Sequence, residues 1–408
     1  MNKFFKFIKR SIKEFLIPFL YKKRICEISS VRNYCEKNKI EIKVLKHAEE
    51  SFVYSPPIYN FKVGELKSVV SPEVYVAKMS KVIVTGGNDY LVANNLWLND
   101  KIDWSTRSLY DFEIGNTKSI DFEKSKVSIL LNRVIHNIPC GINMFGEASL
   151  NYYHWMIDIL GRIVYINQFE ELRDVPLLID EFSLKYDTFK EALDVFDRYH
   201  HPIISISYNK SYCVDDLFYF SPCTFAGIIE SKNATTADKT NPLRFYKDAN
   251  SIKYYRDVGL EYASGSGAYL GDKIIISRNN VSQRLVNEKE IVEVAVKHGF
   301  TIYDPIKYSL RDQISIINKA KIVIGDSGAA FTNSIFGSSS TVFAVILPKE
   351  WHHHCIFSTI AYLAGCKCIY LSARLLECEE QKKGSHYYNS HYLDIEYFED
   401  FLKNGHID

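Results

Sequence analysis

Motifs of several common enzyme classes are missing from this chain of 408 residues. It has no G-x-x-x-x-G-K-[ST] phosphate-binding loop, no G-x-S-x-G turn and no H-E-x-x-H pair. These absences argue against a P-loop NTPase, an α/β-hydrolase and a zinc protease. No Asp-x-Asp pair occurs either, so the usual carboxylate clamp for a metal-bound diphosphate is missing.

The spacing of the cysteines and the lengths of the apolar runs argue against further classes of protein. The nine cysteines include no C-x-x-C pair, which disfavours a zinc ribbon and a thioredoxin-type redox site. Cys366 and Cys368 alternate on one predicted strand, so we expect buried thiols and a reducing, cytoplasmic setting. No uninterrupted apolar run reaches the roughly 20 residues that span a bilayer.

Basic residues are concentrated at the N-terminus. Residues 1–24 contain eight Lys or Arg and one acidic residue, and their apolar residues recur at helical spacing opposite a basic face. This pattern predicts an amphipathic helix on an anionic membrane surface, which would make the protein peripheral on the inner face of the cytoplasmic membrane. The alternative is a helix that packs on the protein itself or on a partner. The rest of the chain has more acidic than basic residues, so no nucleic-acid partner is expected.

The body of the chain has the composition and length of two globular domains, with 47% hydrophobic and 24% charged residues. Short β-rich runs alternate with helical runs in two series, which predicts an α/β fold with two doubly wound, Rossmann-like domains facing a cleft. The expected domains are 25–262 and 263–380, followed by a helical tail over 381–408. Strands are expected at 81–85, 127–131, 175–179, 202–207, 217–220, 273–277, 300–303, 322–324, 342–347 and 367–371. Helices are expected at 152–169, 188–199, 287–298, 310–320, 332–336 and 355–364.

The segment Asn151–Arg162 reads NYYHWMIDILGR. On a helix, His154, Asp158 and Arg162 are four residues apart and share one face. Asp158 can accept a hydrogen bond from His154, which is the arrangement of a general base with its orienting carboxylate. The alternative is a surface ladder of weakly interacting charges. Because the helix is otherwise apolar, we favour a polar stripe that faces a cleft.

An arginine-rich segment, Ile276–Glu290, reads ISRNNVSQRLVNEKE. Arg278 follows a predicted strand and Arg284 lies in the next loop, and ligands of open α/β sheets bind beyond the carboxyl ends of strands. A guanidinium group suits two-pronged binding of phosphate. The alternative is that these arginines pair with Glu288 or Asp326.

A third segment, Ile322–Phe336, reads IVIGDSGAAFTNSIF. A strand that enters a turn of small residues and then a helix gathers free backbone N–H groups at one point, which suits a phosphate or diphosphate. The alternative is an ordinary tight turn between strand and helix. Further on, three adjacent histidines follow Glu350, but neighbours on regular structure cannot all face one ion, so no metal site is predicted. Glu350 is a candidate for binding a ribose hydroxyl.

In their order and separation, these three segments resemble glycosyltransferase family 61, of the bacterial capsule or polysaccharide type. The resemblance implies a GT-B fold, an inverting mechanism, and a nucleotide-sugar donor, for which we expect a uridine diphosphate sugar, with no obligatory metal or other cofactor. It also implies donor binding by residues 263–380 and binding of a glycan or lipid-linked glycan acceptor by residues 25–262.

The predicted site residues combine this likeness with the residue patterns described above. His154 and Asp158 are predicted to be catalytic, and Asn151 and Arg162 to bind the acceptor. The predicted donor-binding residues are Arg278, Arg284, Asn287, Glu288, Ser327, Gly328, Ala329, Ala330, Thr332, Asn333 and Glu350. The family usually has His-Gly-Ala-Gly in the small-residue turn, whereas this chain has Ser327 in place of the histidine. That departure implies an altered donor, a catalytic burden moved onto His154, or a weakened enzyme.

Two other functional classes stay open at this point. One is a catalytically inactive GT-B scaffold that organises polysaccharide assembly at the membrane, which the missing turn histidine favours. The other is a Rossmann-type oxidoreductase. It is disfavoured because the glycines at Gly265 and Gly267 precede their strand instead of following it.

Overall fold

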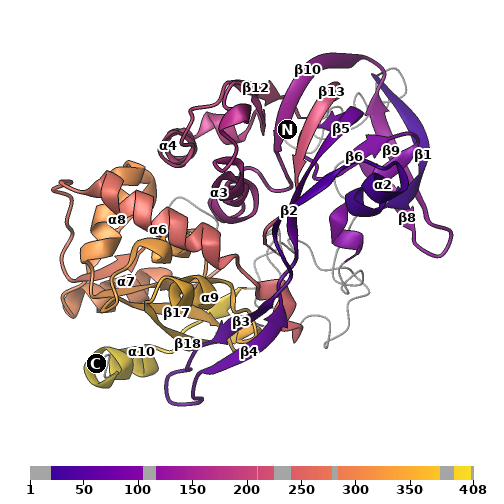
Figure 1. Cartoon of the computed structure of the whole chain (residues 1–408). Coiled ribbons are helices and arrows are strands. Elements are labelled where there is room, and N and C mark those ends of the chain that lie inside the picture. Colours follow the sequence, from indigo (N-terminus) through magenta and orange to yellow (C-terminus); the bar gives the residue numbers. More distant parts are fainter. Residues whose placement is uncertain are drawn as a thin grey trace, which may run out of the picture. The chain divides into compact units, whose positions relative to one another are not determined.

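The computed structural model describes residues 20–103, 116–208, 210–224, 240–277, 284–376 and 390–405 (Figure 1). The chain divides into two compact units, and each is assembled from three segments. Unit 1 comprises Met1–Ala48, Pro72–Phe189 and Tyr199–Lys239, and unit 2 comprises Glu49–Ser71, Lys190–Arg198 and Thr240–Asp408. The helices that the structure describes include none long and apolar enough to cross a bilayer.

Unit 1 is built on one large mixed sheet with the strand order β12-β11-β10-β13-β5-β6-β7-β1-β9-β8, and β2 pairs with β5. The four strands from β12 to β13 are parallel, whereas β13, β5, β6 and β7 pair antiparallel in turn. The strands are β1 (Tyr21–Ser29), β2 (Ile42–Lys46), β5 (Val74–Thr85), β6 (Leu91–Ala93), β7 (Leu96–Leu98), β8 (Thr117–Asp121), β9 (Lys126–Asn132), β10 (Ile135–Met144), β11 (Leu177–Asp180), β12 (Ile203–Ile206) and β13 (Ser211–Phe220).

The five strands expected in this part of the chain coincide with parts of β5, β9 and β13 or overlap β11 and β12. The expected doubly wound arrangement, however, is limited to the parallel strands. The rest of the sheet is mostly antiparallel, and tight turns join β6 to β7 and β8 to β9. One example is the β6–β7 turn, where Asn94 and Asn95 both have positive φ, 47° and 66°, as a type I′ hairpin requires.

The predicted N-terminal helix needs a correction at its end. Tyr21–Arg24 belong to β1, where they pair antiparallel with β9 from Tyr21 opposite Asn132 onward. The helical periodicity of the sequence stops at Leu20, and the strand takes its main-chain hydrogen bonds from β9 instead. Residues 1–19, which carry most of that prediction, lie outside the described residues.

Short helices complete unit 1. Helix α2 (Val31–Lys37) is capped by the Ser30 hydroxyl, and its buried side chains join the apolar core of the sheet. The long helix expected over 152–169 is broken into a π-helical turn (His154–Ile159), a 3₁₀ turn (Leu160–Arg162) and α3 (Ile163–Ile166). Helix α4 (Asp187–Phe196), most of which belongs to unit 2, lies where a helix over 188–199 was predicted.

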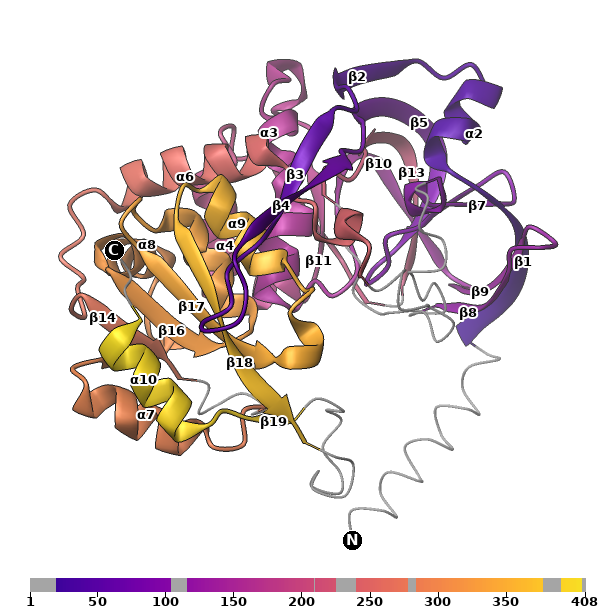
Figure 2. The ribbon, with the colours of Figure 1, turned by 90° about the horizontal axis from the view of Figure 1, so that it is seen from below.

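Unit 2 contains a six-stranded sheet with the order β15-β14-β16-β17-β18-β19, in which only β19 is antiparallel (Figure 2). The strands are β14 (Lys273–Ile276), β15 (Thr301–Tyr303), β16 (Ile322–Asp326), β17 (Val342–Pro348), β18 (Lys367–Leu375) and β19 (His391–Tyr392). Chain order reverses between β14 and β16, and in open α/β sheets ligands bind beyond the strand ends at such a point. The parallel sheet expected here is confirmed.

Helices cover both faces of this sheet. Helices α7 (Glu288–Lys297) and α10 (Ile395–Asn404) pack on one face, and α6 (Ala249–Ala263), α8 (Leu310–Lys319) and α9 (Ile356–Leu363) lie over the other (Figure 2). The helix expected at 332–336 is a 3₁₀ helix, Ala329–Phe336. The expected C-terminal tail contains α10, but its described part begins as the strand β19.

Residues 49–71, 190–198 and 240–262 belong to unit 2, although the sequence placed them before residue 263. The first of these segments forms a hairpin of β3 (Glu50–Ser55) and β4 (Glu65–Val70). Its connecting loop is held by main-chain hydrogen bonds from Tyr59 to Tyr370 and from Tyr370 to Pro57, at 3.0 and 2.9 Å. Hydrogen bonds between residues so far apart in sequence cannot be predicted from local sequence patterns.

Candidate functional site

The π-helical turn His154–Ile159 places the first candidate site at the end of the β10 strand. Asn151 begins the turn, since its side-chain oxygen accepts a hydrogen bond from the Tyr153 N–H at 2.9 Å and its carbonyl accepts one from Trp155 at 2.8 Å. Buried apolar side chains, including Trp155, anchor the turn in the core. Single π-helical turns are rare and occur often at functional sites. Asn151 therefore starts the segment that carries the predicted base.

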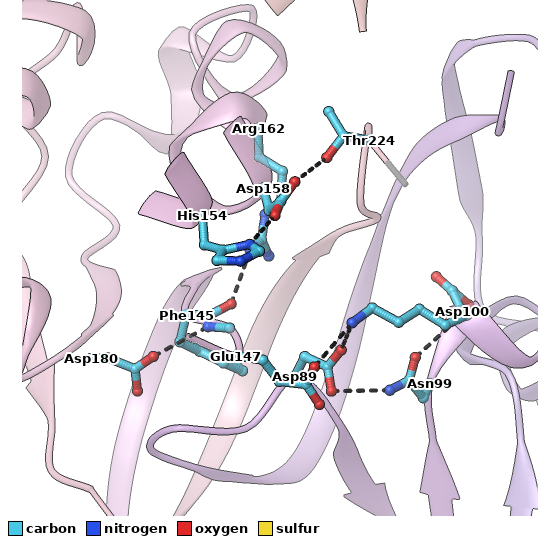
Figure 3. Close-up of polar contacts among 12 residues, drawn as sticks. Asp89, Asn99, Asp100, Phe145, Glu147, His154, Asp158, Arg162, Asp180 and Thr224 are labelled. Atoms are coloured by element: carbon cyan, nitrogen blue, oxygen red, sulfur yellow. Dashed lines mark hydrogen bonds and ion pairs between the residues drawn. The ribbon is translucent and has the colours of Figure 1, made fainter. Parts of the chain in front are cut away.

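His154 and Asp158 form a close pair within this turn. His154 Nδ1 lies 2.5 Å from Asp158 Oδ2, and the Thr224 hydroxyl donates to Asp158 Oδ1 at 2.9 Å (Figure 3). The two side chains are 12% and 9% exposed. Because both carboxylate oxygens are engaged, the imidazole is held in one orientation and its Nε2 atom is the one available for proton exchange.

Arg162, the third residue of the predicted polar stripe, is buried. Its guanidinium group donates to the carbonyls of Ile159, Asn143 and Phe145 at 3.2, 3.2 and 2.9 Å (Figure 3). Burial lowers the Arg162 pKa, although nearby anionic groups oppose this effect. These contacts fasten the helical turn to the end of β10, and an acceptor-binding role for Arg162 stays a prediction.

A buried charge cluster lies close to the pair. Lys101 Nζ is 2.5 Å from Asp89 Oδ2 and 3.4 Å from Glu147 Oε2, and the Asn99 amide donates to Asp89 at 3.1 Å (Figure 3). Burial raises the pKa of Glu147 to about 8, and Asp89 adds to the effect while Lys101 opposes it. Burial by itself lowers the Lys101 pKa, but the two carboxylates raise it above its ordinary value.

The cluster and Asp158 line the same cavity, which has a volume of about 40 Å³. A water molecule needs roughly 10–15 Å³ of such space, so the cavity has room for two or three waters and not for a sugar. Arg162, Thr224 and Tyr219 also line it.

Asp180, the last residue of β11, fixes the loops that carry this cluster. Its carboxylate accepts hydrogen bonds from the N–H groups of Gly87 and Gly146, at 2.7 and 3.2 Å. Burial raises the Asp180 pKa to about 6, and these main-chain bonds oppose the rise. The sequence analysis missed both Asp180 and Glu147, although each follows or ends a parallel strand, where α/β sheets place functional groups.

In unit 2, the second candidate site lies at the reversal point of the parallel sheet. Asp326 ends β16, and its Oδ2 is 3.7 Å from Arg284 Nε, while its Oδ1 is 2.9 Å from His391 Nε2. Arg284 Nη2 also donates to the Ser327 carbonyl. Arg284 therefore pairs with Asp326, as the alternative interpretation proposed. It also lies at the end of a parallel strand, where ligands of open α/β sheets bind. Arg278 lies outside the described residues.

The small-residue turn follows directly. Ser327 N–H donates to the Ile346 carbonyl at 2.9 Å, and Gly328 is fully extended with φ −178°. Gly328, Ala329 and Ala330 are half-buried, so solvent reaches the start of the 3₁₀ helix. Thr332 and Asn333 are buried, and the Asn333 amide donates to Gln313 at 2.8 Å. The accessible part of this turn thus ends before Thr332.

The remaining predicted donor residues lie in different surroundings. Asn287 is buried and exchanges two hydrogen bonds with the Leu393 main chain, at 2.8 and 3.2 Å. Glu288 is buried at the start of α7, whereas Glu350 is exposed on a 3₁₀ turn, Lys349–Trp351. Asn287 therefore holds the C-terminal segment in place, and the donor-binding roles of Asn287, Glu288 and Glu350 stay predictions.

The comparison with known families supports a transferase. Residues 152–344 match the model of the family Glycosyltransferase 61, and this range includes His154, Asp158, Arg284 and Asp326. No curated protein matches the chain. The matched segment thus spans the helical turn of unit 1 and the reversal point of the unit 2 sheet. This match, over residues 152–344 of the 408, supports a family 61 glycosyltransferase.

Proposed function

We propose that this glycosyltransferase moves a sugar from a nucleotide-sugar donor to a glycan or lipid-linked glycan during synthesis of a bacterial surface polysaccharide, such as capsule or O-antigen. The proposed reaction inverts the anomeric centre and uses no metal, and the donor is a uridine diphosphate sugar. Unit 1 binds the acceptor and unit 2 binds the donor.

The observation that carries this proposal is the 2.5 Å contact between His154 Nδ1 and Asp158 Oδ2. With the carboxylate on Nδ1, Nε2 is positioned to accept the proton of an acceptor hydroxyl. Asp158 stabilises the imidazolium that forms, and Thr224 keeps the carboxylate in place at 2.9 Å. A base oriented in this way contributes typically 10²–10⁴-fold to the rate.

In the proposed step, one bond to the anomeric carbon forms as another breaks. The acceptor oxygen forms a bond to the anomeric carbon as its proton passes to His154 Nε2. The bond from the anomeric carbon to the donor phosphate breaks on the opposite face, and the nucleoside diphosphate leaves with the electron pair. Attack opposite the leaving group inverts the configuration.

Arg284 is the described residue best placed to stabilise the leaving phosphate. It lies at the carboxyl end of β16, beside the half-buried turn at Gly328, Ala329 and Ala330. In the structure its Nη2 is bound to the Ser327 carbonyl. A diphosphate would replace that neutral partner with a charged one, and charge-assisted hydrogen bonds are roughly twice as strong.

Calorimetric titration with uridine diphosphate tests the donor role. Arg284→Met is expected to weaken binding by at least tenfold, because a charge-assisted hydrogen bond contributes about 1.5–3 kcal/mol. Arg311→Met is the matched control in unit 2, since its Nη2 donates to the Ser264 carbonyl at 3.1 Å on the exposed surface. Equal affinity in the Arg284 variant and wild type contradicts the phosphate role.

The proposed membrane contact depends on residues 1–24, whose basic excess would be drawn to anionic lipid. Co-sedimentation with phosphatidylglycerol vesicles tests it. Binding that falls with added salt, and that is lost when residues 2–19 are deleted, supports a peripheral location. Unchanged binding of the shortened chain contradicts it.

A further inference from the structure

The charge cluster of Lys101, Asp89 and Glu147 has no part in the proton transfer or donor binding described above. Its side chains are 8%, 17% and 15% exposed, and Lys101 Nζ contacts both carboxylates, at 2.5 and 3.4 Å. Moving such ions out of water costs several kcal/mol each. Replacing a buried ion pair by apolar residues of the same volume often leaves the stability of the protein unchanged. A contribution to folding stability is therefore a weak explanation for the presence of this cluster.

The position of the cluster suggests an electrostatic role. Asp158 lines the same small cavity as Lys101, Asp89 and Glu147. Charges around such a space are screened far less than charges in bulk water. The Asp158 carboxylate contributes to raising the Lys101 pKa, so the two groups stabilise each other's charged forms.

We propose that Lys101, held by Asp89 and Glu147 in the cavity that it shares with Asp158, is a positioning group that keeps Asp158 ionised and sets the basicity of His154. This inference rests on the proposed function, in which His154 is the base. Lys101 contacts neither substrate nor reacting atom and acts only through Asp158.

The sign of each effect follows from charge. The Lys101 cation favours the Asp158 carboxylate and opposes protonation of His154, whereas the Asp89 anion favours protonation. With Glu147 neutral, the ion pair of Lys101 and Asp89 has no net charge. Because burial raises the pKa of Glu147 to about 8, this carboxyl carries its proton at neutral pH and becomes negative above it.

Other ionisable groups face this space from neighbouring elements. Tyr219 of β13 and Arg162 line the cavity, and Asp180 of β11 contacts the Gly146 N–H beside Glu147. The described ionisable groups around the cluster thus include His154, Asp158, Arg162, Asp180 and Tyr219, together with the buried Asp100, whose carboxylate accepts hydrogen bonds from Tyr219 and Tyr75. Burial raises the pKa of Tyr219 far above neutral and Arg162 stays cationic, so neither group changes charge between pH 5 and 9. Asp180 titrates near pH 6 and is kept in all the variants below.

The test is a titration of the His154 imidazole by NMR in the full-length protein, with the resonance assigned from His154→Gln. Lys101→Met is expected to raise the His154 pKa by at least about half a pH unit, and Asp89→Asn to lower it by a similar amount. The double variant Asp89→Asn/Lys101→Met restores the wild-type value because the cluster is again neutral. Shifts of the same sign in both single variants, or no shift in either, overturn the proposal.

A second measurement uses a substitution that keeps the size and shape of the side chain. As Glu147 ionises near pH 8, the wild-type His154 resonance should show a second, smaller inflection. Glu147→Gln resembles the protonated carboxyl and is expected to remove that inflection while leaving the His154 pKa unchanged. Absence of the inflection in wild type overturns the coupling even if the single variants of Lys101 and Asp89 fail to fold.

These titrations are made without substrate, so they separate two possible failures. If His154→Gln transfers sugar normally, the proposed base is wrong but the shifts stand. If the shifts are absent and His154→Gln is inactive, the base is right and the positioning role of Lys101 is wrong.

Discussion

His391 Nε2 lies 2.9 Å from Asp326 Oδ1, and both side chains are only 2% exposed. The edge strand β19 is thereby tied to the last residue of β16, at the reversal point of the unit 2 sheet. Main-chain bonds reinforce this link, since His391 N–H donates to the Arg284 carbonyl at 2.8 Å. His391 thus connects the C-terminal strand to Asp326 and to Arg284, the residue proposed to bind the donor.

Replacing His391 tests this connection. His391→Ala is expected to lower the free energy of unfolding by about 1–3 kcal/mol, because a buried carboxylate loses a hydrogen-bond partner. Chemical denaturation measures the change, and Lys289→Ala on the exposed face of α7 is the control. A stability equal to wild type contradicts the structural role of the pair.

Arg162 offers a test between two roles. Its three main-chain partners predict that Arg162→Met lowers the free energy of unfolding by about 3 kcal/mol or more, since buried carbonyls lose a charged donor. Arg162→Lys should restore little, because an ammonium group lacks the planar fork of donors. Arg173→Met, at a side chain that is 59% exposed, is the control. A stable Arg162→Met protein with a raised KM for acceptor would instead support acceptor binding.

The raised pKa of Asp180 predicts a pH-dependent stability. The folded protein holds this proton up to about pH 6, whereas the unfolded chain releases it near pH 4. The folded state therefore binds more protons in this window, and the contribution of Asp180 to the free energy of unfolding falls as pH rises from 4 to 6, by up to about 3 kcal/mol.

Asp180→Asn should remove that part of the pH dependence. Denaturation at pH 4, 5 and 6 measures it, with Asp174→Asn as the control because that side chain is 92% exposed. Identical slopes for the Asp180 variant and wild type show that the carboxyl titrates normally in the folded protein.

Much of unit 2 was predictable from the sequence because its strands and helices alternate along the chain. The run Ile322–Ile324 and the helix ending before Gly299 are examples, and Gly299 adopts φ +83° as a helix stop. The strand β19 was not predictable, since two residues give no periodicity and the hydrogen bonds of His391 to Arg284 and Asp326 join residues far apart in sequence.

The candidate site was predictable only in its local part. The spacing of His154 and Asp158 indicated their contact. The π-helical turn that brings them together could not be predicted, because the apolar pattern indicates only a helix. Lys101 and Asp89 come from short connections far from that helix, so no motif joins them to it. Asp180 directly follows the predicted strand 175–179 and could have been found by that position alone, whereas Glu147 follows β10, which was not predicted.

The rate of sugar transfer by His154→Gln tests the central claim most directly, measured under single-turnover conditions with the donor at saturation. The account predicts a fall of about 10²–10⁴-fold while the calorimetric affinity for uridine diphosphate and the free energy of unfolding stay at their wild-type values. Transfer at a near-normal rate by the folded variant would contradict it.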